Sequence, residues 1–141
     1  MSRIKKNVQV HQLEGETLFG AYLAKPDSCA ILISYSGGTR NVLKAASLLS
    51  RNNIPIIAIT SLGENELTEQ ATVSLRIATK EKLYSKIGTF STDLSITYLL
   101  DVLYGCLFSQ NYDHNVYLRK KASEIIELSR VANSSILKED D

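Results

Sequence analysis

The chain has 141 residues, a net charge of +1 at pH 7 and a hydrophobic content of 44%. A chain of this length can bury a substantial core, which predicts one globular domain. A net charge so close to zero provides no overall field toward nucleic acid, so direct binding of DNA or RNA is not expected. No apolar stretch approaches the roughly 18 residues of a membrane span, so membrane association is not expected either.

The start of the chain and its cysteines indicate the compartment. The N-terminal sequence MSRIKKNVQVH lacks the apolar region of a signal peptide. Cys29 and Cys106 each lie in an apolar run, where a free cysteine behaves as a small hydrophobe, so both are predicted to be reduced core residues. We therefore expect a cytoplasmic chain. His11 and His114 are far apart in sequence, and we predict neither a metal site nor a cofactor.

The first part of the chain carries the patterns of short strands and one helix. Residues 7–11 alternate apolar and polar side chains, which predicts a short strand. Residues 13–24 have apolar side chains at loosely helical spacing, and Pro26 breaks that segment. Residues 29–33 form a continuous apolar run, which is typical of a strand buried on both faces of a parallel sheet.

Helix and strand patterns alternate in the middle of the chain. Residues 40–52 place apolar side chains at i, i+3, i+4 and i+7, which predicts an amphipathic helix. Residues 54–59 then predict a strand, residues 64–70 a short helix, and residues 72–77 a third strand. This order of strands and helices implies right-handed crossovers and therefore a parallel sheet.

Two further helices are predicted in the last part of the chain. Residues 91–108 are nearly all apolar or small after Asp93, and Ser91 or Thr92 can cap this helix. Its wide apolar face suits either core packing or a dimer surface. Residues 113–130 carry apolar side chains on one side and charged side chains on the other, which predicts the last helix.

The stretch SYSGGT, residues 34–39, follows a predicted strand and directly precedes a predicted helix. Ligands of open parallel α/β sheets bind outside the carboxyl ends of the strands. The N–H groups and the dipole at a helix start favour an anion, and Gly37 and Gly38 permit close approach. Three hydroxyl donors belong to the stretch: Ser34, Ser36 and Thr39. The stretch is therefore interpreted as a neutral cradle for a phosphate or another oxyanion.

An alternative interpretation of SYSGGT is a serine-rich turn in which Thr39 is an ordinary N-cap, and the spacing fits this equally well. The motifs GxxxxGK[ST] and GxGxxG are absent, so a nucleotide loop is not expected. Ser36 is not expected to be a catalytic nucleophile, because the GxSxG elbow is absent and no histidine partner is evident.

Three segments, in the same order, resemble one known family. The motif S-x-S-G-x-T, here SYSGGT, is similar to the phosphosugar-binding loop of the SIS (sugar isomerase) domain. The run IIAITSLGENELTEQA resembles the next strand, loop and short helix of that domain. The segment IGTFSTDLSITYLLDVL resembles a G-x-x-S-S-x-x-x-x-x-Y-L-x-D-x-L segment of RpiR-type transcriptional regulators. We expect a SIS domain over residues 1–130 and a polar tail over residues 131–141.

The resemblance implies an α/β fold, namely a three-layer α/β/α sandwich around a parallel Rossmann/flavodoxin-like sheet. It implies a phosphosugar site in which hydroxyls of the loop are assisted by main-chain N–H groups and by Ser91 at the start of the later helix. The loop residues of this site are Ser34, Tyr35, Ser36, Gly37, Gly38 and Thr39. Thr60 and Ser61, at the neighbouring strand end, either line the pocket or close the turn.

The sequence departs from the family pattern in several places. The first strand–helix unit of a SIS domain and the N-terminal helix-turn-helix of RpiR-type regulators are both expected to be missing. Gly38 stands where the family has an acidic residue, and Asp93 stands where an arginine is common. A carboxylate at residue 93 would disfavour a nearby phosphate, so direct contact of that helix start with the phosphate is not favoured.

The resemblance implies a binding module rather than an enzyme. The chain would sense a phosphorylated sugar or amino sugar as the effector domain of an RpiR-type regulator of sugar metabolism, as a homodimer. An alternative is a phosphosugar isomerase, which requires a general base. No spacing singles out a base among the candidates Glu64, Glu66, Glu81, His11 and His114. A third hypothesis is a structural module that dimerises and binds no ligand.

Overall fold

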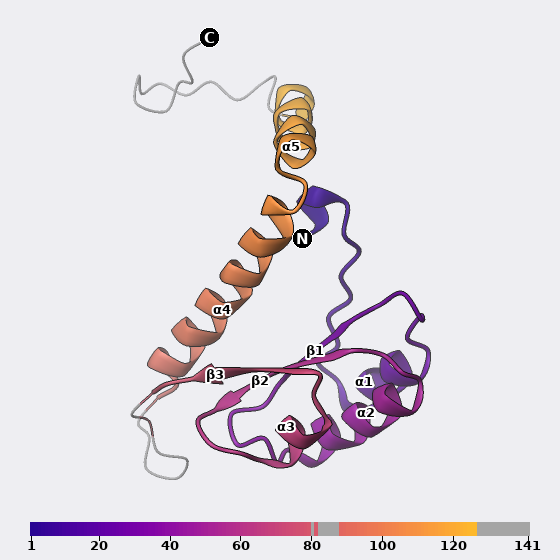
Figure 1. The fold of residues 1–141 in the computed structure, drawn as a ribbon, viewed down its shortest axis with the longest axis vertical. Helices are drawn as coiled ribbons and strands as arrows, with labels where there is room; N and C mark the ends of the chain where they lie inside the picture. Colours follow the sequence, from indigo (N-terminus) through magenta and orange to yellow (C-terminus); the bar gives the residue numbers. More distant parts are fainter. Residues whose placement is uncertain (80, 82–87, 127–141) are drawn as a thin grey trace. The chain divides into compact units, whose positions relative to one another are not determined.

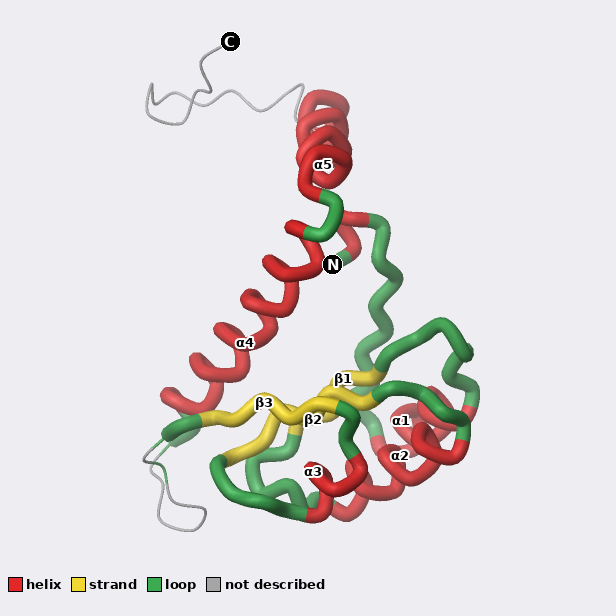
Figure 2. Tube along the Cα trace, in the orientation of Figure 1, coloured by secondary structure: helices red, strands yellow, loops and turns green. Residues whose placement is uncertain are grey.

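The structure is a computed structural model that describes residues 1–79, 81 and 88–126. The chain divides into two compact units, which we describe separately. One unit is Gln9–Val102, and the other is Met1–Val8 together with the chain from Leu103 onward. Figures 1 and 2 trace the helices and strands along the chain.

A parallel sheet of three strands, in the order β1-β2-β3, forms the centre of the unit Gln9–Val102. The strands are β1 (Ala30–Ile33), β2 (Ile56–Ser61) and β3 (Val73–Ile77). The register places Ala30 of β1 opposite Ile56 of β2, and Ile57 of β2 opposite Val73 of β3. The alternation of strand and helix patterns in the sequence predicts this parallel arrangement, and the structure confirms it.

Three helices lie on one side of this sheet in Figure 1. They are α1 (Glu14–Tyr22), α2 (Arg40–Arg51) and α3 (Glu66–Gln70). Helix α2 contacts both β1 and β2, and it also contacts α1 and α3. The parallel sheet flanked by helices is the fold class that the sequence predicts.

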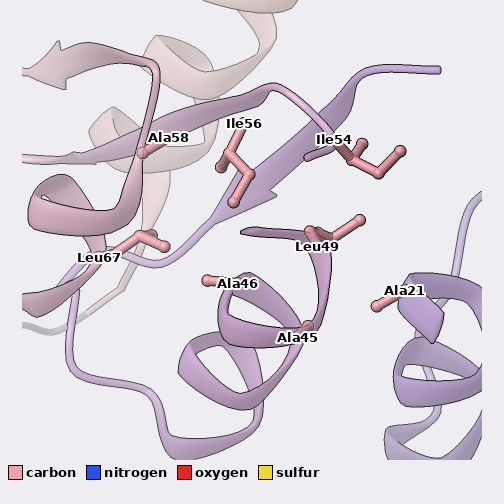
Figure 3. Packing of buried hydrophobic residues seen from close by; sticks show 8 residues of the cluster. All are labelled: Ala21, Ala45, Ala46, Leu49, Ile54, Ile56, Ala58 and Leu67. Carbon is pink, nitrogen blue, oxygen red and sulfur yellow. The ribbon is translucent and has the colours of Figure 1, made fainter. Parts of the chain in front are cut away.

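The core of this unit lies between α2 and the sheet (Figure 3). Ala45 and Ala46 of α2 are small, so the helix can pack closely against the strands. Larger buried side chains fill the remaining space around them, and burying each one stabilises the fold by roughly 1.5–3 kcal/mol. They are Leu49, Ile54, Ile56 and Leu67, and Ala21 and Ala58 complete the cluster.

The described part of the other unit, residues 1–8 and 103–126, contains helices and no strand. It includes η1 (Ser2–Ile4) and α5 (Tyr112–Ile126), which contact each other. Helix α4 (Phe90–Ser109) begins one residue before its predicted start. The amide of Asn115 donates a hydrogen bond to the carbonyl of Phe108 at 2.9 Å, which joins the end of α4 to α5. Residues 127–130 of the predicted last helix lie outside the described residues.

Two predictions are wrong. Residues 7–11 are in neither a helix nor a strand, and Val8 and Val10 are 51% and 75% exposed, so their alternation does not reflect a buried face. The side chains of Cys29 and Cys106 are free and exposed, not part of the core. An apolar neighbourhood in sequence did not place these small side chains inside, because Cys29 precedes β1 and Cys106 lies on an exposed position of α4.

Candidate functional site

The SYSGGT loop connects the carboxyl end of β1 to the start of α2, as the sequence predicts. The start of the loop lies beside β2, since the N–H of Ser34 donates to the carbonyl of Ile59 at 3.0 Å. The loop therefore lies at the edge of the parallel sheet where ligands of such sheets bind.

The hydroxyls at the two ends of the loop meet. Ser34 is 5% exposed, and its Oγ lies 2.8 Å from Oγ1 of Thr39 in a hydrogen bond. Thr39 occupies the N-cap position of α2, but its side chain makes no capping hydrogen bond. The interpretation of Thr39 as an ordinary N-cap is therefore wrong, because its hydroxyl faces Ser34 across the loop.

The start of α2 suits an anion. The first N–H groups of a helix have no partners within the helix. At α2 the side chain of the N-cap residue does not accept a hydrogen bond from them. The first turn of α2 contains no acidic residue, and its first residue, Arg40, is exposed. The helix dipole and this guanidinium both favour negative charge here. The sequence reasoning missed Arg40, although its position directly after the loop is a visible signal.

The two glycines of the loop differ in what they require. Gly37 is buried and has φ +66°, and a Cβ at this position would overlap the side chain of Asn65. Gly38 is exposed, and a Cβ there would meet nothing within 4 Å. Only Gly37 is therefore fixed as glycine by the fold, because both its conformation and its neighbour exclude a side chain.

Two of the loop N–H groups that were expected to assist a ligand are bonded within the loop. The N–H of Gly37 donates to the carbonyl of Ser34 at 3.1 Å, and the N–H of Gly38 donates to Oγ of Ser36 at 3.2 Å. Ser36 and Gly38 are both exposed, so a ligand can approach them from solvent.

Thr60 and Ser61 both hold the main chain of the SYSGGT loop at Tyr35. Thr60 is fully buried, and its hydroxyl donates to the carbonyl of Tyr35 at 3.3 Å and accepts from the amide of Asn65 at 3.1 Å. The N–H of Ser61 donates to the same Tyr35 carbonyl at 3.0 Å. These contacts favour the second of the two interpretations that the sequence left open.

Asn65 holds the start of α3 against the loop. Its side chain accepts from the N–H of Thr68 at 3.2 Å, while Thr68 Oγ1 accepts from the N–H of Asn65 at 3.0 Å, which forms a capping box. The N–H of Leu67 donates to the carbonyl of Gly37 at 3.1 Å. The sequence reasoning missed Asn65, although the pair Asn65 and Thr68 has the three-residue spacing of a capping box.

Arg76 of β3 fixes the connection between β2 and α3. Its guanidinium forms an ion pair with Glu64 at 2.9 Å and donates to the carbonyls of Ser61 and Gly63. Glu64, one of the candidate bases, is thus engaged in a structural contact next to the loop.

Glu81 connects the loop to α4. The hydroxyl of Tyr35 donates to the main-chain carbonyl of Glu81 at 2.6 Å. The carboxylate of Glu81 accepts from the N–H groups of Ser91 and Thr92 at 2.9 and 3.3 Å, and from the hydroxyls of both residues. The hydrogen bonds from Ser91 and then Thr92 lower the pKa of Glu81 from 4.5 to about 2, so the carboxylate is charged at neutral pH.

The six predicted loop residues thus form one loop, and Thr60 and Ser61 contact it through the carbonyl of Tyr35. Ser91, the seventh predicted binding residue, is bonded to Glu81 and is linked to the loop through Glu81 and Tyr35. Among the described residues, no group of His, Cys, Asp and Glu side chains could hold a metal ion. No described helix is long and apolar enough to cross a membrane.

A shallow hollow of about 280 Å³ lies at the opposite edge of the sheet, before β2 and β3. Its lining residues are Ser50, Asn53, Ile54, Pro55, Gln70 and Thr72. This is the amino edge of the parallel strands, where ligands of such sheets do not normally bind, so we do not assign the site to it.

Comparison with known proteins identifies the family. The model of the SIS domain matches residues 1–104. An uncharacterized HTH-type transcriptional regulator of Caldanaerobacter subterraneus subsp. tengcongensis is 23% identical over 94% of this chain and 46% of its own length. An uncharacterized HTH-type transcriptional regulator of Clostridium perfringens is 25% identical over 74% of this chain and 37% of its own length. The chain thus spans less than half the length of these relatives.

A solved structure has the same fold. It is the NanR protein of Vibrio vulnificus complexed with ManNAc-6P, which matches with a TM-score of 0.78 and 23% identity. The match covers 94% of this chain and 49% of the NanR chain. Together with the family model, which covers well over half of the sequence, these findings show that the chain belongs to the SIS domain family.

Proposed function

We propose that this chain is a phosphosugar-binding sensor domain of an RpiR-type transcriptional regulator, and that it holds the phosphate of its ligand at the SYSGGT loop. The regulator would control sugar or amino-sugar metabolism. The relatives, which are HTH-type transcriptional regulators, and the NanR neighbour, whose structure is a complex with ManNAc-6P, support this proposal.

The observation that carries the proposal is the open start of α2. Thr39 does not cap the helix, no acidic residue occupies the first turn, and Arg40 adds a positive charge. The exposed hydroxyl of Ser36 lies in the same loop. A phosphate needs several hydrogen-bond donors and a favourable field, and both are present here without a lysine or a metal ion.

Two of the five candidate bases are engaged in contacts that favour binding over isomerisation. A general base must reach the proton that it removes, and it needs a pKa near the working pH. Glu64 is paired with Arg76, and Glu81 has a pKa of about 2 with four hydrogen bonds to its carboxylate. Both carboxylates would have to leave these partners to act as a base, so the isomerase is kept as the second candidate.

The proposal extends to the partners of the chain. We expect the sensor to act as a homodimer, and we expect DNA to be bound by another part of a full-length regulator. Ligand binding would then shift the populations of two dimer geometries, which is how an effector domain can act on distant DNA-binding domains.

The experiment is a binding screen of the full chain by thermal shift and calorimetry. The panel contains phosphorylated sugars and amino sugars, including ManNAc-6P, together with the same sugars without phosphate. We expect binding only of phosphorylated compounds. Ser36→Ala should weaken that binding about tenfold, equivalent to about 1.4 kcal/mol, because it removes an exposed hydroxyl of the loop.

The matched control is Ser47→Ala, which removes an exposed serine from α2 outside the loop and should leave the affinity unchanged. Equal binding of phosphorylated and unphosphorylated sugars would contradict the proposal. So would an unchanged affinity in Ser36→Ala. Turnover of a sugar phosphate by the chain would favour the isomerase instead.

A further inference from the structure

The start of α4 already holds an anion that belongs to the chain itself. Helix α4 begins at Phe90, so the N–H groups of Ser91 and Thr92 belong to the first turn, which has no partners within the helix. One oxygen of the Glu81 carboxylate accepts from both N–H groups, at 2.9 and 3.3 Å. The hydroxyls of Ser91 and Thr92 also donate to this carboxylate.

A phosphate at this place would use the same donors. The free N–H groups of a helix start and a hydroxyl on its first turn are the contacts that such a start offers to an external anion. Here Ser91 gives both its N–H and its hydroxyl to Glu81. A ligand can therefore use Ser91 only if the Glu81 carboxylate leaves it.

A second carboxylate reinforces this effect. Asp93 lies in the first turn of α4 and accepts from the hydroxyl of Thr89 at 2.7 Å. Two negative charges at one helix start oppose the approach of a third, because like charges repel. The first turn of α2 has the opposite character, with no acid and with Arg40.

The main chain of Glu81 has a separate contact. Its carbonyl accepts from the hydroxyl of Tyr35 at 2.6 Å, and the same hydroxyl lies 3.0 Å from Oγ1 of Thr79. Tyr35 belongs to the SYSGGT loop, and its carbonyl is held by Thr60 and Ser61. Glu81 thus connects the loop to the first turn of α4 through one residue.

We propose that Glu81 is a positioning residue whose carboxylate fills the anion-binding start of α4 while its carbonyl holds Tyr35, so that a ligand phosphate is directed to the SYSGGT loop and not to Ser91. The inference rests on the proposed function, because it concerns which of two helix starts receives the ligand. It also reassigns Ser91 from a ligand donor to a partner of Glu81.

The test follows backbone amide signals by NMR in the full chain, with inorganic phosphate as the probe. In the wild type, phosphate should shift the amide signals of Gly38 and Arg40 and leave those of Ser91 and Thr92 in place. In Glu81→Ala the signals of Ser91 and Thr92 should respond to phosphate. The response should be larger in Glu81→Ala/Asp93→Asn, since the second carboxylate is also neutralised.

Two further variants keep the test independent of folding. Glu81→Gln keeps the shape and an acceptor oxygen but removes the charge. If Glu81→Ala loosens α4, the Ser91 and Thr92 signals should respond less to phosphate in Glu81→Gln than in Glu81→Ala. Glu124→Gln removes a charge from an exposed position of α5 and should behave as the wild type. These controls separate the loss of the carboxylate from a general change of charge.

Two results would overturn the inference. One is a wild type in which Ser91 and Thr92 respond to phosphate together with the loop. The other is that the amide signals of Ser91 and Thr92 do not respond to phosphate in any Glu81 variant. Loop amides that do not respond to any phosphorylated compound would count against the proposed function instead, so the two failures can be told apart.

Discussion

The starts of α2 and α4 lie in the same compact unit, and they differ in what surrounds their unpaired N–H groups. Both leave N–H groups without partners in the helix. At α2 the N-cap residue Thr39 turns its hydroxyl to Ser34 and leaves the helix start open. At α4 the carboxylate of Glu81 occupies the start.

The difference shows how side chains make two helix starts unequal as places for an anion. A helix N-terminus is a common feature and has little specificity by itself. What distinguishes the two starts is the charge of the side chains around them, with Arg40 at α2 and two carboxylates, Glu81 and Asp93, at α4. Variants at four positions test this difference, beginning with the one for which we expect the greatest loss of stability.

The largest effect is expected from Gly37→Ala. Gly37 has φ +66°, and an alanine Cβ there would overlap the side chain of Asn65. Backbone strain of this kind costs about 1–3 kcal/mol, and the displacement of Asn65 adds to it, so the free energy of unfolding should fall by about 2–4 kcal/mol. Urea unfolding measures it. Gly38→Ala is the control, because its Cβ meets nothing, and an equal loss in both variants would contradict the geometry of the loop.

Asn65→Ala should have the next largest effect. It removes an N-cap side chain, which costs about 1 kcal/mol, and it leaves the buried hydroxyl of Thr60 with one donor fewer. We expect a loss of about 1–2 kcal/mol in urea unfolding and a weaker affinity for a phosphorylated sugar. Asn65→Asp keeps the capping oxygen but not the donor to Thr60, and it should recover part of the stability. Full recovery would mean that the contact with Thr60 contributes nothing.

Ser34→Ala should have a smaller effect on stability. Ser34 is buried, and its side chain forms a hydrogen bond with Thr39, so the loss of this bond should cost about 1 kcal/mol. The freed hydroxyl of Thr39 could then cap α2 in the ordinary way and close the open helix start. We therefore expect ligand affinity to fall more than stability does. Calorimetry measures the affinity and urea unfolding measures the stability. A larger loss of stability than of affinity would contradict the proposed difference between the two helix starts.

The last prediction concerns how stability depends on pH at Glu81. The expected effect is the smallest of the four, and it is specific to one carboxylate. The pKa of Glu81 is lowered to about 2 in the folded chain, from an ordinary value of 4.5, mainly by the hydrogen bonds from Ser91 and Thr92. A lowered pKa gives stability that is present above pH 4.5 and is lost as the pH falls through about 2.

The difference in urea midpoint between the wild type and Glu81→Gln should therefore be constant from pH 7 to pH 5 and should shrink toward pH 2. The comparison cancels the other carboxylates, which titrate in both proteins. A difference that does not change with pH would show that the Glu81 carboxylate is not bonded to the start of α4.

Much of the fold could be predicted from residue patterns. The continuous apolar runs at β1 and β2 and the i, i+3, i+4, i+7 spacing of α2 are strong signals, and the structure confirms these elements within two residues. The alternation of residues 7–11 was misleading, because alternation predicts a strand only when a neighbour pairs with it and covers one face. The exposure of Cys29 and Cys106 could not be predicted, since it depends on which side of each element faces solvent.

The candidate site was predictable only in part. The loop hydroxyls and glycines follow from the motif, and the geometry explains the role of Gly37 by its contact with Asn65. The contacts of Glu81 could not be read from the sequence, because they join residues ten and eleven positions apart. Nor could the sequence decide whether Ser91 faces a ligand or another side chain, since both uses require the same hydroxyl.

The edge of the sheet at β1 bears on whether the protein self-associates in concentrated solution. It pairs only with β2 among the described residues, and its four residues, AILI, carry no charge. Such an uncharged edge presents main-chain donors and acceptors that another extended chain can pair with. Cys29 lies directly before this strand, and partial burial raises the pKa of its thiol, so it should react slowly at neutral pH. Its labelling rate, followed as the protein concentration rises, offers a chemical reporter of self-association along this edge.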